Sequence, residues 1–403
     1  MTRRELLGVA DVSDTTLLSY AATRLGLDAA DCALRGSSAS VVDYDLDAIT
    51  TAGRWWVVAD VTTPEGDRQV RFFVKHVQSW TRSPYFAFVP PELREAAAQG
   101  VPWRTEPLVY TSDLADQLPD GLTMPAVVDV RFVDDLSAVI WLEAVDTVER
   151  DWDPAAVTRT AHLLGRLAAS PRVRPLAAIG EADGRRGVRS YTEGRLQGQV
   201  VPLLRSDELW QHPALVETFE PGLRARLLGH LDRVGDYIDW LEQVPEGAAH
   251  GDACPNNLLR RAGDDDLVVI DFGFWSTQPL GFDLGQLLLG DVQLGRRPAS
   301  QLASLDPLCV EAYASGVAQE GVDIDLPTLR RAHALHMLLF SGFSAFLVDG
   351  LLGGMPGPSS ATEDTTAQER LQGLVQHLRE RAVLTTFVLD LVDATEGIGQ
   401  PRR

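Results

Sequence analysis

The spacing of apolar residues changes once along this chain of 403 residues, close to Asp153. Before that point, apolar residues alternate with polar ones or form short runs rich in β-branched and aromatic side chains, which is typical of strands. Beyond it, they recur with helical spacing. Strands in the first part of the chain and helices in the remainder predict an α+β fold.

The first part of the chain is expected to form a small antiparallel sheet with helices beside it. A helix at its start has apolar spacing suited to covering the sheet, and turn-like sequences at 50–53 and 63–67 separate the first strands. The expected elements are a helix over 12–28, strands over 40–49, 54–61 and 69–77, short helices over 91–99 and 103–118, and strands over 124–133 and 137–145.

The remainder is expected to be mainly helical, with one hairpin inserted. Asp153 and Pro154 are a favourable cap and first-turn residue for the first helix. The segment 256–273 predicts two short strands joined by a Gly-Asp turn, and 171–221, with several arginines and prolines, predicts an irregular insertion. Helices are expected over 154–170, 221–244, 301–318, 327–352 and 365–393.

The charge and the cysteines of the chain exclude several classes of protein. With 36 basic and 57 acidic side chains the formal net charge is -21, so the surface should repel nucleic acids and anionic membranes. The one long apolar segment, 335–354, is interrupted by His336 and Asp349, which favours a buried helix over a membrane span. Three dispersed cysteines and the absence of a signal-peptide pattern favour a cytoplasmic protein.

Two residue types are almost absent, and the few that occur stand at informative positions. Lys75 is the only lysine, and Asn256 and Asn257 are the only asparagines. A codon bias toward arginine explains the depletion but not the positions that remain. Because a compact ammonium in a defined pocket cannot be exchanged for a planar guanidinium, we expect Lys75 to carry chemistry.

The clearest chemical signal is HGDACPNNLL followed by VVIDFGFW. Asp252 and Asn257 lie five residues apart, and Asp271 follows nineteen residues after Asp252 at the end of an apolar strand. Phosphoryl transfer needs a carboxylate close to the acceptor hydroxyl and oxygen ligands for Mg²⁺. A loop followed by a hairpin can bring these side chains together, in the order found in protein kinases.

These residues resemble the aminoglycoside phosphotransferase-like branch of the protein-kinase superfamily, in which HGDxxxxN and an IDF-type segment are signatures. The resemblance extends in layout over about residues 35–395 and is most specific between about 250 and 285. It implies a protein-kinase-like fold of two lobes. The N-terminal lobe would be a small antiparallel β lobe over residues 1–142, and the C-terminal lobe a larger, mainly helical one over 143–403.

The resemblance also implies the chemistry, which is ATP-dependent O-phosphorylation with Mg²⁺. Asp252 would be the catalytic acid that orients or deprotonates the acceptor, while Asn257 and Asp271 would bind Mg²⁺ beside the nucleotide. Asp283, in a DLA-like element, is expected to be structural. His250 is expected to support the loop rather than act as a base, since Asp252 fills that role.

By the same resemblance, Lys75 would contact the α- and β-phosphates and pair with a helical glutamate. Glu106 is the expected partner, because an aliphatic-aromatic pair follows it, and Glu95 is the reserve.

The nucleotide loop departs from the protein-kinase pattern, because no GxGxxG occurs. Thr50, Thr51 and Gly53 are expected to cover the phosphates with hydroxyls and backbone amides. The last strand of the first lobe resembles the hinge that binds adenine through backbone atoms, which places Glu143 and Val145 beside the base.

The sequence leaves the acceptor open. The acidic balance suits a small hydroxylated and cationic antibiotic such as an aminoglycoside. A second hypothesis is a kinase subunit that phosphorylates Ser or Thr of a ribosomally synthesised precursor peptide, as in class V lanthipeptide-type pathways, with 171–221 helping to form a peptide groove. A third is a nucleotide-binding pseudokinase, against which the retention of the expected lysine, both aspartates and the asparagine argues.

Overall fold

The computed structural model describes residues 4–43, 49–148, 152–183, 187–263, 265–348, 351 and 367–399. Its most extended feature is the hairpin of β2 (Thr51–Thr63) and β3 (Gly66–Gln78). Buried and more exposed residues alternate along much of both strands, because successive side chains of a strand point to opposite faces. The hairpin therefore has one face that must be covered by other elements.

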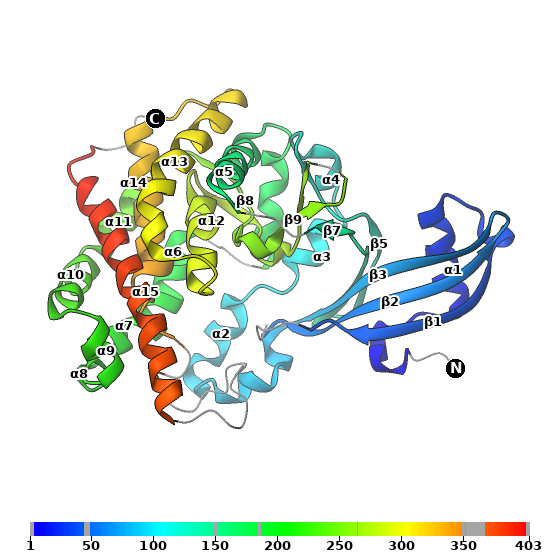
Figure 1. The fold of residues 1–403 in the computed structure, drawn as a ribbon, viewed down its shortest axis with the longest axis horizontal. Helices are drawn as coiled ribbons and strands as arrows, with labels where there is room; N and C mark the ends of the chain where they lie inside the picture. Colours follow the sequence, from blue (N-terminus) through cyan, green and yellow to red (C-terminus); the bar gives the residue numbers. More distant parts are fainter. Residues whose placement is uncertain are drawn as a thin grey trace.

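Five antiparallel strands form the sheet that contains this hairpin, in the order β1-β2-β3-β6-β5. The other three strands are β1 (Ala33–Val41), β5 (Val127–Asp134) and β6 (Ser137–Glu143). All residues of β6 are buried: Val139 and Trp141 face one apolar core, and Ile140 faces the larger core shared with the helices. Figure 1 shows the sheet projecting to one side of the helical part of the molecule.

The helix α1 (Asp14–Leu25) covers one face of the sheet, as its apolar spacing predicts. Ser13 caps its start by accepting a backbone hydrogen bond, and Gly26 ends it in the left-handed conformation. Tyr20 packs against Trp141 of β6, with ring centroids 5.7 Å apart. The N-terminal segment is therefore part of the packed core.

Two expectations for the first strands are wrong. The first strand occupies Ala33–Val41 instead of 40–49, and residues 51–53, expected as a turn, belong to β2. β1 pairs with β2 through the small residues GSSAS, whose low strand propensity conceals the strand in the sequence. Residues 44–48 of the expected strand lie outside the described part of the chain.

Three short helices follow β3, namely α2 (Arg94–Gly100), α3 (Thr105–Tyr110) and α4 (Leu114–Gln117). The last two replace the single helix expected over 103–118. The Ser112 hydroxyl donates to the carbonyl of Val109 and accepts from the N–H of Leu114, so a local turn competes with the helix between them.

Helices dominate the rest of the described chain, which confirms the α+β prediction. Asp153 caps the first of them by accepting from the N–H of Ala156. The helices are α5 (Pro154–Ala169), α6 (Val188–Tyr191), α7 (Val201–Arg205), α8 (Asp207–Trp210), α9 (Pro213–Thr218), α10 (Pro221–Leu231), α11 (Val234–Leu241), α12 (Phe282–Gln293), α13 (Leu302–Gln319), α14 (Leu326–Met337) and α15 (Ala367–Ala394).

Three helical expectations need correction. The segment 171–221 is largely built of short helices rather than being irregular, and the helix expected over 221–244 is broken into α10 and α11. The helix expected over 327–352 ends its regular part at Met337 and continues as one wide turn, Leu338–Gly342. Among the described residues, no helix has the length and apolar character needed to span a membrane.

Two small sheets hold the segment that contains the sequence motifs. One has the order β4-β10-β9-β7, and the other pairs β8 with β11. Their strands are β4 (Leu122–Thr123), β7 (Thr147–Val148), β8 (Glu246–Ala249), β9 (Leu258–Arg261), β10 (Leu267–Val269) and β11 (Ser276–Pro279). The loop 250–257 is thereby fixed between β8 and β9, and Asp271 follows β10 directly, as the hairpin prediction requires.

Candidate active site

Asp283, at the start of α12, anchors the loop 250–257. Its carboxylate oxygens accept hydrogen bonds from the backbone N–H groups of His250, at 2.8 Å, and Gly251, at 2.9 Å. Gly251 has a φ of 84°, and a Cβ there would lie 2.2 Å from the carbonyl oxygen of Phe274. This position therefore requires glycine, and Asp283 has the structural role that the sequence suggests.

His250 also supports the loop. Its Nδ1 accepts from the N–H of Asp252 at 3.3 Å, and its Nε2 donates to the carbonyl of Ile270 at 2.9 Å. These partners assign the neutral tautomer with the proton on Nε2. The ring packs on Phe272, with centroids 5.2 Å apart. Both nitrogens are occupied by the backbone, so Asp252 is left as the titratable group of the loop that can meet a ligand.

Asp252 and Asn257 face each other across the loop. The Nδ2 of Asn257 donates to the carbonyl of Asp252 at 2.9 Å and to its carboxylate at 3.0 Å. This orientation turns the Oδ1 of Asn257 away from Asp252, as an oxygen that can meet a cation. Burial raises the pKa of Asp252, in the direction that favours a carboxylate able to accept a proton.

Asp271 lies in the left-handed backbone region, with a φ of 63°, which is rare for a residue other than glycine. Its Oδ1 lies 3.0 Å from the Nζ of Lys75. Burial alone would raise the pKa of Asp271, but Lys75, together with Arg54 and His250, outweighs burial and lowers it. Its side chain remains 34% exposed, so the carboxylate is ionised and accessible to a second cation.

Lys75 connects this carboxylate to a second one. Its Nζ lies 2.6 Å from the Oε2 of Glu106 on α3, and both side chains are 6% exposed. Burial and the nearby Asp271 carboxylate raise the pKa of Glu106 to about 7, although Lys75 opposes the change. Glu95, the reserve candidate, is exposed on α2. The glutamate that pairs with Lys75 is therefore Glu106.

One cation beside this group was not anticipated from the sequence. Arg54 on β2 lies directly opposite Lys75 on β3, and its charge acts on Lys75, Glu106 and Asp271. Counting residues along the hairpin away from its turn would have placed Arg54 there. Lys75 and Arg54 are therefore two cations close to the carboxylate of Asp271.

The residues predicted to cover the phosphates lie at the start of β2 and just before it. The carbonyl of Thr50 accepts from the N–H of Gln78, and the hydroxyl of Thr51 lies 3.5 Å from a guanidinium nitrogen of Arg54. The pairing with β3 is irregular at this point, and a Cβ on Gly53 would lie 2.3 Å from the ring of Trp55. Thr51 thus approaches the arginine rather than the tip of a loop.

Glu143 and Val145, predicted beside the base, differ in their environment. The carboxylate of Glu143 is held by Arg24 and Arg261, and its N–H donates to the carbonyl of Ala126. A contact with a base through the Glu143 side chain would require these ion pairs to break. Within the described chain, no group accepts a hydrogen bond from the N–H of Val145.

Phe274 is a second residue that the sequence reasoning missed. The neighbouring aromatic residues Phe272 and Trp275 are buried, whereas Phe274 is 51% exposed. Its backbone lies against Gly251, next to Asp252. An exposed ring at this position offers an apolar surface beside the carboxylate.

Together, the structure brings Lys75, Glu106 and Asp271 into direct contact, and joins Asp252 to Asn257. The charges of Asp252 and Asp271 act on each other, so the two groups are close. The arrangement combines buried cations, carboxylates and an amide oxygen. Such a set can bind a polyanion together with a divalent cation and can accept a proton beside it.

Comparisons with known proteins agree with this chemistry. A family model described as the phosphotransferase enzyme family matches residues 51–313, which is more than half of the chain. No curated protein matches at the significance level applied.

Several solved structures resemble the chain. An aminoglycoside phosphotransferase from Alicyclobacillus acidocaldarius is 16% identical, with 88% of this chain and 93% of that chain covered and a TM-score of 0.47. Plasmodium vivax ethanolamine kinase is 13% identical, with coverages of 95% and 92% and a TM-score of 0.44. An amicoumacin kinase in complex with AMP-PNP and Ca²⁺ is 13% identical, with coverages of 86% and 89% and a TM-score of 0.42.

Proposed function

Because the chain belongs to the phosphotransferase enzyme family, whose kinase-like fold it has, we propose that it transfers the γ-phosphoryl group of ATP to a hydroxyl group of a small molecule. In this proposal the nucleotide binds between an N-terminal lobe, residues 1–142, and a C-terminal lobe, residues 143–403. The new bond joins the acceptor oxygen to the γ-phosphorus, the bond to the β-phosphate oxygen breaks, and ADP leaves. The hydroxyl proton passes to Asp252.

The observation that carries the proposal is the convergence of two pairs of groups from distant parts of the chain. Lys75 on β3 bonds the carboxylate of Asp271, while Asn257 bonds that of Asp252, and the two aspartates are close. Positioning and charge stabilisation are the main protein contributions to phosphoryl transfer. The presence of these four side chains in one place favours an active enzyme rather than a pseudokinase.

The residues present suit Mg²⁺. Asp271 offers an exposed ionised carboxylate and Asn257 offers its Oδ1, and oxygen ligands of this kind are the ones that Mg²⁺ prefers. A bound Mg²⁺ would neutralise charge on the nucleotide phosphates. Lys75 and Arg54 would hold the phosphates from the sheet, with Thr50, Thr51 and Gly53 beside them. Glu106 would fix the Lys75 ammonium.

Adenine would be bound by the segment that follows β6. The Val145 N–H has no acceptor in the described chain, in contrast to the neighbouring N–H groups of Glu143 and Ala144, which donate to carbonyls. A free donor at the end of an inner strand can meet a ring nitrogen of the base. Glu143 would then act through its backbone and not through its carboxylate.

The acceptor would be a small hydroxylated molecule that bears positive charge. The net charge of -21 favours a cationic acceptor such as an aminoglycoside or an amino alcohol. The exposed ring of Phe274 beside Asp252 would contact an apolar or cationic face next to the reacting hydroxyl.

The experiment that tests the proposal is transfer of labelled γ-phosphate from ATP to pooled acceptors, with mass spectrometry to identify the product. The pools are aminoglycosides, other hydroxylated antibiotics, amino alcohols and Ser/Thr-rich peptides. Asp252→Ala should reduce transfer at least about 1,000-fold and leave nucleotide affinity within a fewfold. Asp265→Ala is the matched control. Asp265 lies at the exposed tip of the β9–β10 hairpin, which follows the loop of Asp252, so this variant should retain full activity.

Two outcomes would overturn the proposal. An Asp252→Ala variant with full activity would remove Asp252 from the chemistry. A wild-type protein that binds nucleotide but modifies only peptides would replace the small-molecule acceptor with a protein one.

A further inference from the structure

Glu143 is the point where three separate parts of the chain meet. Its Oε2 lies 2.5 Å from a guanidinium nitrogen of Arg24, and its Oε1 lies 2.7 Å from one of Arg261. The same Oε1 accepts from the N–H of Ala126 at 3.0 Å. The Glu143 side chain is 8% exposed, so this is a buried carboxylate with both oxygens engaged.

The two arginines come from elements with different positions in the fold. Arg24 lies in the last turn of α1, the helix that covers the sheet. Arg261 ends β9, the strand that begins directly after Asn257, and its partner strand β10 leads to Asp271. One carboxylate therefore links the N-terminal helix to the hairpin that carries the proposed metal ligands.

The segment that starts at Glu143 is held on both sides. The N–H of Ala144 donates to the carbonyl of Arg71 at 3.2 Å, and the carbonyl of Asp146 accepts from the N–H of Ala262 at 2.8 Å. Val145, whose N–H is the proposed donor to adenine, lies between them. The carboxylate of Glu143 thus lies at the start of the segment that would bind the adenine base.

Arg24 lies outside the residues that the family model matches, which begin at residue 51. Its position is nevertheless fixed, because Leu17 and Ala21 of α1 are buried in the core beneath the sheet and Tyr20 packs on Trp141. The guanidinium is presented to Glu143 by a helix that is itself well packed. The ion pair between Arg24 and Glu143 thus depends on an N-terminal helix that lies outside the matched residues.

We propose that Arg24, Glu143 and Arg261 form a hinge clamp through which the N-terminal helix sets the affinity for nucleotide. Glu143 fixes the backbone that carries the Val145 N–H, and Arg261 holds that backbone in register with the hairpin of Asn257 and Asp271. Arg24 and Arg261 are positioning residues, since neither contacts a reacting atom. The inference rests on the proposed function, because it concerns how ATP is held.

The test is a comparison of KM for ATP, kcat and directly measured ADP affinity in four variants. Arg24→Gln keeps the length of the side chain and removes its charge, and Arg24→Lys keeps the charge. Arg35→Gln is the matched control, because Arg35 pairs with Asp67 only at 3.6 Å and both side chains are more than half exposed. Arg261→Gln removes the charge of the second arginine that pairs with Glu143.

Arg24→Gln and Arg261→Gln should raise KM for ATP and weaken ADP binding about five- to tenfold, with kcat within about twofold of the wild type. Arg24→Lys should recover part of the affinity, and Arg35→Gln should change nothing. Unchanged ADP affinity in both glutamine variants would overturn the inference, and so would a fall in melting temperature with no change in KM. If the wild-type protein itself binds no nucleotide, the proposed function fails, and the inference fails with it.

Discussion

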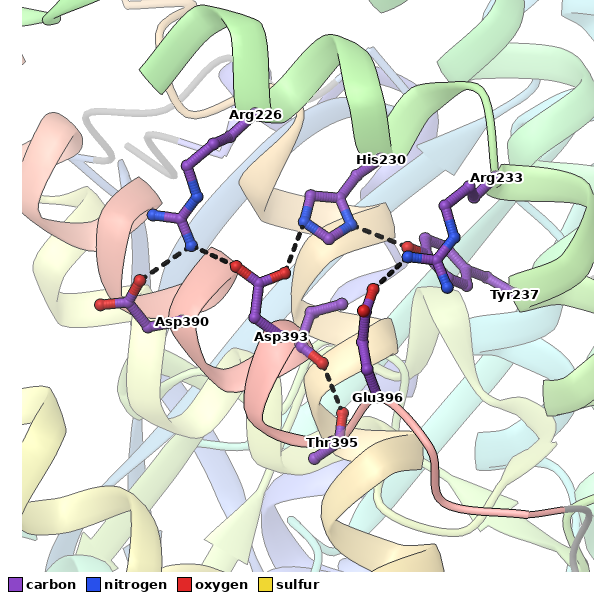
Figure 2. A network of polar contacts seen from close by, with 9 residues as sticks. Arg226, His230, Arg233, Tyr237, Asp390, Asp393, Thr395 and Glu396 are labelled. Carbon is purple, nitrogen blue, oxygen red and sulfur yellow. Dashed lines mark hydrogen bonds and ion pairs between the residues drawn. The ribbon is translucent and has the colours of Figure 1, made fainter. Parts of the chain in front are cut away.

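Two ionic clusters in this molecule are built from similar residues and differ in how deeply their charges are buried. In the first, at the proposed active site, the single ammonium of Lys75 lies between the carboxylates of Glu106 and Asp271. The second joins α10 to the end of α15, and Figure 2 shows its side chains facing each other in a row. We call the second the α10–α15 clasp. It consists of Arg226, His230, Arg233, Asp390, Asp393 and Glu396.

The two arginines of the clasp pair with all three of its acids, and burial lowers the pKa of His230, which favours the neutral imidazole. Arg226 bonds Asp390 at 2.8 Å and Asp393 at 2.6 Å, His230 lies 3.1 Å from Asp393, and Arg233 bonds Glu396. Most of these side chains are partly exposed, so water shares in solvating them. The clasp is therefore a largely solvated contact between α10 and the end of α15.

The active-site cluster, by contrast, is buried around Lys75 and Glu106, where one ammonium lies between two carboxylates and Arg54 is the nearby second cation. Burial raises the pKa of Glu106, whereas the nearby cations lower that of Asp271 against the effect of burial. A buried cluster with perturbed pKa values is typical of a functional site, whereas solvated ion pairs between helices contribute little beyond packing. The residue types alone would not distinguish the active site from the clasp. His230, Asp393 and Glu396 of the clasp also bring potential metal-ligand atoms within 4.8 Å of one another.

Removing the one lysine should have a large effect on catalysis. Lys75→Met leaves Glu106 buried without its ammonium and removes one of the two cations proposed to hold the nucleotide phosphates, so kcat/KM should fall about 100- to 1,000-fold. Lys75→Arg should also lose most activity, because a planar guanidinium cannot occupy the site of a compact ammonium between two carboxylates. Steady-state kinetics with ATP check both. Arg68→Met, an exposed change on the same strand, is the control.

Metal removal should separate the two clusters. Chelation with EDTA should abolish phosphoryl transfer, and Asp271→Asn should reduce it at least about 100-fold even at high Mg²⁺. The melting temperature of the nucleotide-free protein should not respond to EDTA, since arginines already satisfy the acids of the clasp. A fall in melting temperature on chelation would instead indicate a metal ion held by the clasp.

The pH dependence of stability should report on Glu106. Its carboxyl has a pKa of about 7 in the folded protein against an ordinary value of 4.5. Between these pH values the folded protein keeps a proton that the unfolded chain has lost, so this group lowers the free energy of unfolding as pH rises. Glu106→Gln removes the titration, so its stability relative to the wild type should rise over that interval, by about 3 kcal/mol at most.

Chemical denaturation of both proteins at pH 4.5, 6 and 7.5 measures this difference. A difference in unfolding free energy that stays constant across the three pH values would show that Glu106 is ionised throughout, and that Lys75 neutralises it fully despite the presence of Asp271.

The ordered motif let the sequence predict the core of the site. The loop that contains Asp252 and Asn257 lies just before a hairpin, and Asp271 follows it, so local connectivity alone brings these groups near one another. The choice of Glu106 over Glu95 depended on the short pattern that follows it. The proximity of these groups could be predicted because chain neighbours and strand ends fix the geometry, whereas their chemical roles stay predictions.

Arg54 was within reach of the sequence but was missed. The turn at 63–67 was predicted correctly, and stepping back along both strands from Thr63 and Gly66 brings Arg54 opposite Lys75. The expectation of a second turn at 50–53 removed Arg54 from the interior of a strand. An error in one turn thus concealed a cation of the site.

The hinge clamp lay beyond sequence reasoning. Glu143 is 119 residues from Arg24 and 118 from Arg261, and only the packing of α1 on the sheet and the placement of β9 bring them together. The break between α10 and α11 is similar, since Arg233 at that break is held by Glu396 from the far end of the chain. Contacts of this range depend on tertiary structure and leave no local pattern.

The smallest effect should come from the clasp. Asp393→Ala removes a partner of both Arg226 and His230, but Arg226 and Asp393 are partly exposed and Arg226 keeps Asp390, so the free energy of unfolding should fall by about 1 kcal/mol. The loss should shrink in 0.5 M salt, because screening weakens the pairs that the variant lacks. kcat and KM for ATP should equal those of the wild type. A loss of activity comparable to that of Lys75→Met would mean that the clasp, despite its exposure to solvent, is coupled to the active site.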